Sequence, residues 1–229
     1  MKITQISEYS LPAEGGLPPL QDMIYQELRR RPDEVFEYQG EELMRAFPRL
    51  KRSALNWSLW LLAKMGLSLE GWLYFRQLTE LADFAKAVPD LTIILNHVGG
   101  LIREGIYANR DDEILPIWRS GIAAVAACPN VVIKLGGMGM PANGFDWHTR
   151  TQPIGSEELA ESMAPFMNYC IEQFGPERCM FESNFPVDKV SFSYNIMYNA
   201  FKRLSKDYSA TERAAMFHDT AARVYKIDV

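Results

Sequence analysis

The chain has 229 residues, of which 48% are hydrophobic and 23% charged, a composition typical of a globular protein with a substantial core. Its net charge of −5 at pH 7 argues against nucleic acid or an anionic membrane as a partner. Three cysteines without a CxxC pair, and an N-terminus without a basic segment before an apolar one, favour a cytoplasmic protein with no disulfide framework.

The beginning of the chain differs in character from the rest. One strand is expected at 2–9, a charged and mostly helical segment at 27–52, and an amphipathic helix at 53–66. We expect a single domain, in which this atypical segment of residues 1–66 precedes a β/α region of residues 67–229.

From residue 67 onward, short apolar runs alternate with longer amphipathic ones. The last helical region begins with Ser209 and Glu212, which have the spacing of a capping box. This alternation predicts a parallel sheet covered by helices, either an open α/β sheet or part of an eight-stranded barrel. Strands are predicted at 67–75, 91–97, 130–137 and 178–184, and helices at 78–89, 112–128 and 156–174.

Polar side chains stand where these strands end. Ligands bind at the carboxyl ends of parallel strands, and alternate side chains of a strand share a face, so these side chains are expected to meet at one rim. A histidine and carboxylates can transfer protons, while lysine and arginine can polarise a carbonyl or bind a carboxylate. The candidates are His97, Lys134, Glu182 with Asn184, and Tyr74 with Arg76.

Each candidate also has a purely structural interpretation. Lys134 can simply pair with Glu182, and Asn184 can form a turn before Phe-Pro. The long loop after the third strand predicts a lid or binding loop, in which His148 contacts substrate and Arg150 helps to bind a carboxylate.

Four stretches resemble a known family. They are "TIILNHVGG", "NVVIKLGG", "FGPERCMFESNFPVDK" and "FHDTAARVYKI". Over about residues 60–228 the chain is similar to the amidohydrolase-related family of TIM-barrel metal-dependent hydrolases, in the branch of 2-pyrone-4,6-dicarboxylate lactonase. The resemblance implies that the predicted strands are the fifth to eighth of a TIM barrel, so that the chain carries about its C-terminal half.

The resemblance also implies roles for individual residues. His97 matches a histidine that is a metal ligand or polarises the substrate, and Asn184 stands where many members carry an aspartate that is the general base or a ligand. Pro186 matches the proline of that motif, whereas the family's H-x-H pair has no counterpart. A zinc-like metal would therefore rest on His97 and Asn184, and metal-free operation is the alternative. Because an amide cannot accept a proton as a carboxylate does, the base would be Glu182 or Asp188.

These observations favour a hydrolase that acts on a small carbonyl compound, a lactone above all. The alternatives are a non-catalytic or truncated barrel remnant and a decarboxylase of the same superfamily. We expect a small-molecule substrate, and no nucleic-acid or membrane partner. An open sheet edge needs cover, which helices 27–52 and 53–66 or a second copy in a homo-oligomer would provide.

Overall fold

The computed structural model describes residues 62–228. The chain divides into two units, Met1–Leu67 and Ser68–Val229, and the strands and helices named below belong to the second. The single domain expected from the sequence stays a prediction. The expected strand 2–9, helix 27–52 and most of helix 53–66 lie outside the described residues.

The four predicted strands form one parallel sheet in chain order. All are shorter than predicted, and the largest difference is in the first, which ends at Gly71 and not at residue 75. Their register brings Gly71 level with Leu95, and Ile133 level with Leu95 and Cys179, so the carboxyl ends of the strands form one edge. The strands are β1 (Ser68–Gly71), β2 (Thr92–Leu95), β3 (Val131–Leu135) and β4 (Cys179–Phe181).

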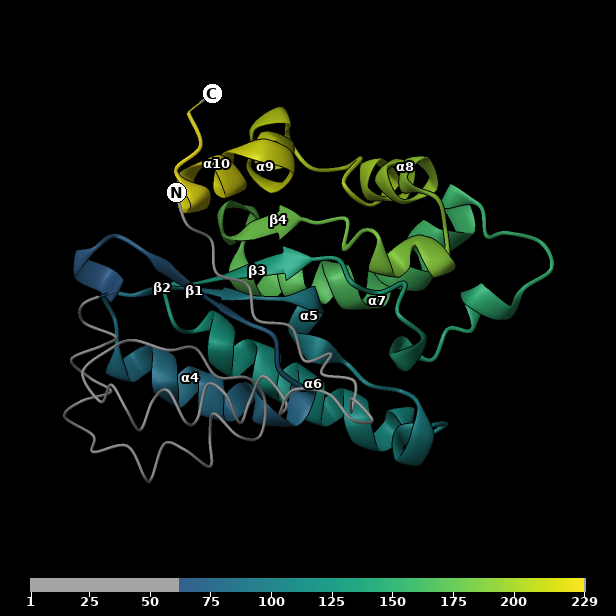
Figure 1. Cartoon of the computed structure of the whole chain (residues 1–229), viewed down its shortest axis with the longest axis horizontal. Helices are drawn as coiled ribbons and strands as arrows, with labels where there is room; N and C mark the ends of the chain where they lie inside the picture. Colours follow the sequence, from purple (N-terminus) through teal and green to yellow (C-terminus); the bar gives the residue numbers. More distant parts are fainter. Residues whose placement is uncertain (1–61, 229) are drawn as a thin grey trace, which may run out of the picture. The chain divides into compact units, whose positions relative to one another are not determined.

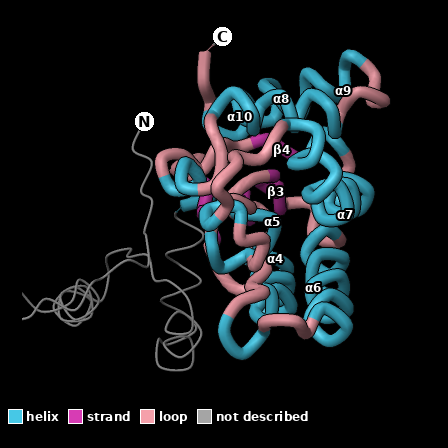
Figure 2. Tube along the Cα trace, turned by 90° about the vertical axis from the view of Figure 1, so that its right-hand side faces the viewer, coloured by secondary structure: helices cyan, strands magenta, loops and turns pink. Residues whose placement is uncertain are grey.

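Helices cover both faces of the sheet. Figure 1 shows α4 and α6 on one side of the strands and α10 on the other, an arrangement that Figure 2 confirms from a second direction. The predicted helix 156–174 is present with those bounds, and the Ser209–Glu212 capping box is formed. The helices are α4 (Leu78–Ala87), α5 (His97–Gly100), α6 (Asp111–Ala126), α7 (Ser156–Phe174), α8 (Tyr194–Leu204), α9 (Ala210–Ala214) and α10 (Thr220–Tyr225). Within residues 62–228, no helix is both long enough and apolar enough to span a bilayer.

The chain leaves β2 through a left-handed turn. A branched residue such as Val98 rarely adopts a positive φ, and strained residues of this kind cost about 1–3 kcal/mol each. Burial holds the turn, since Val98 is fully buried and the Trp118 indole N–H donates to its carbonyl oxygen at 2.8 Å. The four successive residues with positive φ are His97 (52°), Val98 (47°), Gly99 (76°) and Gly100 (61°).

Substitution of Gly100 tests how tightly this turn is packed. A Cβ atom at this position would lie 1.8 Å from the carbonyl oxygen of Leu73. We expect Gly100→Ala to lower the free energy of unfolding by more than about 3 kcal/mol in denaturant titrations, because it adds a clash to an unfavourable φ. Gly105 is the matched control, since it has a similar φ of 60° but a Cβ there would meet no atom within 4 Å. Gly105→Ala should cost about 1 kcal/mol, and equal losses in the two variants would contradict the proposed clash.

Candidate functional site

A short polar contact at the carboxyl edge of the sheet joins His97 to Glu182. His97 opens the turn after β2, and Glu182 directly follows β4. Oε1 of Glu182 lies 2.5 Å from Nδ1 of His97 and also accepts the His97 backbone N–H at 3.3 Å. An ionised carboxylate only accepts hydrogen bonds, so it pairs with an Nδ1–H, and in the neutral imidazole Nε2 then presents a lone pair. Nε2 has no hydrogen-bond partner among the described residues.

Two glycines at the end of β3 make this contact sterically feasible. A Cβ on Gly136 would lie 2.3 Å from Cγ of Glu182, and a Cβ on Gly137 would lie 2.5 Å from Nδ1 of His97. Gly137 also has a φ of 70°, which disfavours any other residue. The sequence "LGG" after the third strand therefore leaves room for both functional side chains.

Lys134 lies between two carboxylates. Its Nζ donates to Oε2 of Glu70 at 2.9 Å and is 3.9 Å from Oε2 of Glu182. Asn96 donates to the same Glu70 oxygen at 3.3 Å, and the Tyr225 hydroxyl donates to the other at 2.5 Å. Burial alone would raise the pKa of Glu70, but these hydrogen bonds and the charge of Lys134 lower it below its ordinary value.

Aromatic rings flank His97 on the β1 side. The indole of Trp72 meets the imidazole edge to face, with ring centroids 6.1 Å apart, and Tyr74 contacts the same indole at 6.1 Å. Tyr74 thus lies one ring away from His97. Its role in substrate binding stays a prediction.

Asn184 and Asp188 form a second polar cluster. The Asn184 amide donates to Oδ1 of Asp188 at 2.7 Å, and the Gly139 N–H donates to Oδ2 at 3.0 Å. Asp188 is only 1% exposed. The geometry thus shows Asp188 joining the loops after β3 and β4, and it favours Glu182, which contacts His97, as the carboxylate of the site.

Two arginines and one histidine that the sequence analysis named do not contact the polar group around His97. Because β1 ends at Gly71, the expectation that Arg76 shares a strand face with Tyr74 is wrong. Arg76 is exposed in a 3₁₀ turn, and its Nε donates to the Tyr107 hydroxyl at 3.1 Å. His148 is exposed in the turn Trp147–Thr149. Arg150 pairs with Glu158 at 2.6 Å.

The described residues do not by themselves form a metal site. A catalytic metal ion generally needs three protein ligands. In residues 62–228, no group of three or more His, Cys, Asp or Glu side chains could hold one. Metal binding by His97 and Asn184 therefore stays a prediction from the resemblance, and no step below uses a metal.

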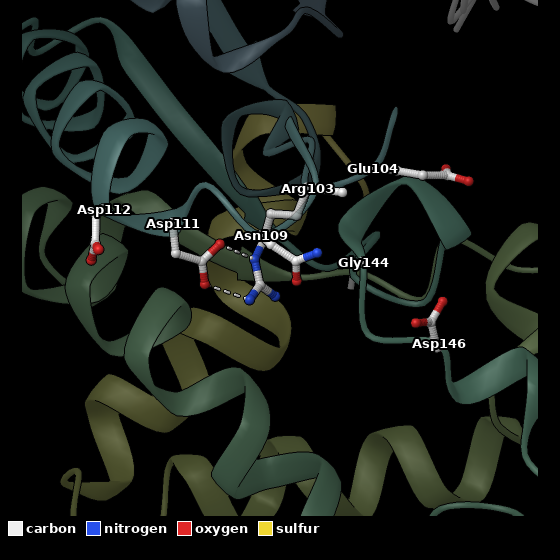
Figure 3. Close-up of a pocket in the computed structure, with 8 residues that line it drawn as sticks. Arg103, Glu104, Asn109, Asp111, Asp112, Gly144 and Asp146 are labelled. Carbon is white, nitrogen blue, oxygen red and sulfur yellow. Dashed lines mark hydrogen bonds and ion pairs between the residues drawn. The ribbon is translucent and has the colours of Figure 1, made fainter. Parts of the chain in front are cut away.

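A cavity of about 430 Å³ lies elsewhere, between the loops that follow β2 and β3. Figure 3 shows that its arginine, Arg103, points to Asp111, with which it forms hydrogen bonds of 2.9 and 2.6 Å. This cavity contains no histidine and none of the residues around His97, so we place the functional site at the sheet edge. The lining residues are Arg103, Glu104, Ala108, Asn109, Asp111, Asp112, Gly144 and Asp146.

Glu70 and Tyr225 were not predicted from the sequence as partners in the polar group around His97 and Lys134. Glu70 is a charged residue inside the apolar run "LSLEGWLYF", and a buried carboxylate requires a partner, which is a usable signal. Tyr225 carries no such signal, because its partner Glu70 is 155 residues away in the sequence.

The buried Asp188 predicts a pH-dependent stability. Burial raises its pKa from 3.8 to about 6, although hydrogen bonds from Gly139 and Asn184 oppose the shift. The folded state then keeps this proton to higher pH than the unfolded state. The resulting stabilisation is fully present below about pH 4 and is lost as pH rises through about 6, which lowers the free energy of unfolding by roughly 3 kcal/mol. Urea titrations from pH 4 to 7 should show this decline in the wild type and a flatter profile in Asp188→Asn. Parallel profiles would contradict the assignment.

Known proteins resemble this chain over most of its length. The amidohydrolase family model matches residues 12–227. An uncharacterized protein of Sinorhizobium fredii is 37% identical over 166 residues, and the L-fucono-1,5-lactonase of Burkholderia multivorans is 30% identical over 153 residues. These matches cover 72% and 66% of this chain and 49% of each relative, so the chain spans about half the length of the curated relatives it matches.

Solved structures agree with the sequence matches. An amidohydrolase of Burkholderia multivorans with bound zinc superposes with a TM-score of 0.68 at 25% identity, covering 88% of this chain and 70% of that chain. The parallel β/α arrangement is therefore that of the amidohydrolase TIM barrels, as predicted, with four strands in the described residues. Together with a family model that matches nearly the whole sequence, this establishes that the chain belongs to the amidohydrolase family.

Proposed function

We propose that this amidohydrolase hydrolyses a small lactone, with His97 as the general base. The observation that carries the proposal is the His97–Glu182 pair, in which a carboxylate fixes the Nδ1–H tautomer and leaves Nε2 without a protein partner in the described part of the chain. A carboxylate that orients an imidazole and stabilises its charged form is a recurrent arrangement in acyl-transfer enzymes.

The proposed reaction balances without further reactants. Nε2 of His97 takes a proton from a water molecule, and the oxygen of that water bonds to the lactone carbonyl carbon. The tetrahedral intermediate then collapses by breaking the bond to the ring oxygen, which takes the proton back from Nε2. The product is the open hydroxy acid, and Glu182 stabilises the imidazolium that exists between the two proton transfers.

Lys134 supplies the positive charge in this scheme. Among the described residues, it is the lysine beside the catalytic pair, with its Nζ 3.9 Å from the Glu182 carboxylate that contacts His97. Its side chain is 13% exposed, and a charge acts more strongly where little water screens it. We assign to Lys134 the stabilisation of the negative oxygen in the tetrahedral intermediate.

The charges around His97 favour an uncharged substrate. Lys134 is already shared by Glu70 and Glu182, while Arg150 pairs with Glu158 and Arg76 lies with Tyr107. The basic side chains that the sequence offered for carboxylate binding are thus engaged. With two carboxylates and one ammonium, the cluster would repel an anionic ligand. A relative at 30% identity is an L-fucono-1,5-lactonase, which supports a neutral lactone as the substrate.

Substitution of His97 tests the proposed base. We expect His97→Gln to lower kcat for a neutral 1,5-lactone by at least about 100-fold, because it removes the proton acceptor. Hydrolysis is followed by the release of acid in a weakly buffered solution. His218, whose Nδ1 lies 2.8 Å from Asp219 in an exposed pair, is the matched control, and His218→Gln should keep the wild-type rate.

The same assay separates the competing functions. Equal rates for wild type and His97→Gln would contradict the role of His97. A folded wild type that binds a lactone without turnover would favour the non-catalytic alternative.

Substrate charge provides a second test. We expect kcat/KM for an uncharged sugar 1,5-lactone to exceed that for a pyrone carrying two carboxylates by about tenfold or more, because each added negative charge meets Glu70 and Glu182. Raising the salt concentration should narrow this ratio by screening the repulsion. A preference for the dicarboxylate would contradict the argument from charge.

A further inference from the structure

The C-terminal helix α10 packs on the sheet face that carries the site. Glu70 is in register with Ile94, and Ile94 with Val132, so these side chains lie on one face. Lys134, two residues after Val132, lies on the same face at the carboxyl end. Ala221, Val224 and Tyr225 pack against the buried cluster of Ile94, Val132 and Met180 on this face.

Tyr225 extends from this helix into the charged group. Its hydroxyl donates to Oε1 of Glu70 at 2.5 Å, while Lys134 and Asn96 donate to Oε2 at 2.9 and 3.3 Å. The ring of Tyr225 also lies 5.6 Å from Nζ of Lys134, within the range of a cation–π contact. Each oxygen of Glu70 therefore accepts at least one hydrogen bond, and these donors fix the orientation of the carboxylate.

Loss of the Tyr225 hydroxyl would change how Lys134 is shared between the carboxylates of Glu70 and Glu182. Oε1 of Glu70 would remain buried without its donor, which is costly, and the ammonium of Lys134 already donates to the other oxygen of this carboxylate at 2.9 Å. Rotation of the carboxylate towards Lys134 would bring both of its oxygens to Nζ. This would draw Nζ away from Glu182, from which it is now 3.9 Å.

We infer that Tyr225 is a positioning residue, which through Glu70 keeps Lys134 at the distance from Glu182 and His97 that catalysis requires. This inference rests on the proposed function of the site. It makes α10 part of the catalytic unit, although Tyr225 contacts neither His97 nor the reacting atoms.

Tyr225→Phe tests the inference, because it keeps the ring and deletes only the hydroxyl. We expect kcat for a neutral 1,5-lactone to fall about tenfold with KM unchanged within a factor of about two, as expected when a hydrogen bond to a charged group is lost. Val224→Ala is the matched control on the same helix and in the same apolar cluster. It should lower the melting temperature but leave kcat and KM unchanged, and a similar fall in kcat in both variants would overturn the inference.

The double variant with Glu70→Gln examines the route of the effect. If Tyr225 acts through Glu70, then adding Tyr225→Phe to Glu70→Gln should cause no further loss of kcat. Additive losses would overturn the proposed route.

Crystal structures of the wild type and Tyr225→Phe give a readout that does not depend on turnover. We expect the distance between Nζ of Lys134 and Oε2 of Glu182 to increase in the variant, with Nζ closer to both oxygens of Glu70. An unchanged Lys134 overturns the positioning role. A wild type inactive on lactones combined with a displaced Lys134 refutes the proposed function and leaves the positioning of Lys134 by Tyr225 supported.

Discussion

Glu182 connects the last strand of the sheet with the end of the second strand. One of its oxygens accepts both the ring Nδ1–H and the backbone N–H of His97, and the other lies near Lys134 of the intervening strand. This carboxylate thereby links side chains from β2, β3 and β4. It also compensates for part of the strain of the left-handed turn, because it binds the first residue of that turn at two points.

The contact between Glu182 and His97 constrains the residues at the end of β3, which lies between β2 and β4, and it involves a residue of β1 through Lys134. The end of β3 must lack side chains, which Gly136 and Gly137 provide. Lys134 has a second negative partner, Glu70 on β1, which lies 2.9 Å from its Nζ, so the lysine charge is shared between two carboxylates. The four strand ends are therefore electrostatically interdependent. A change of charge at any one of them would alter the electrostatic environment of the His97 imidazole.

The sequence predicted the strands and the meeting of His97, Lys134 and Glu182, because parallel strands bring their carboxyl ends to one edge. It did not predict where β1 ends, and Arg76 was misplaced for this reason. The direction of the chain after Gly71 depends on packing, such as the close approach of Gly100 to Leu73, and alternation in the sequence does not contain this information. Tyr225 was missed because its contact joins the two ends of the described chain, and no local pattern encodes such a pair.

Asn184 has a structural partner that the sequence did not predict. Its amide donates to the buried carboxylate of Asp188 at 2.7 Å, and its expected role in the site stays a prediction. Asp188 was expected as an alternative base, but its burial and its bond to the Gly139 N–H fit a residue that joins two loops. Its catalytic role remains a prediction, as do the substrate contacts of Tyr74, Arg76 and His148.

The paired glycines at the end of β3 also limit how specificity can diverge in this scaffold. Any larger residue there collides with Glu182 or His97, so this strand end cannot offer new side chains to a ligand. Among the described residues, the segments after β1 and β4 offer other positions close to this site: Trp72 meets the His97 ring edge to face and Tyr74 contacts Trp72, while Phe185 lies in the segment that follows Glu182. A mutational library for altered substrate preference would start from those two segments.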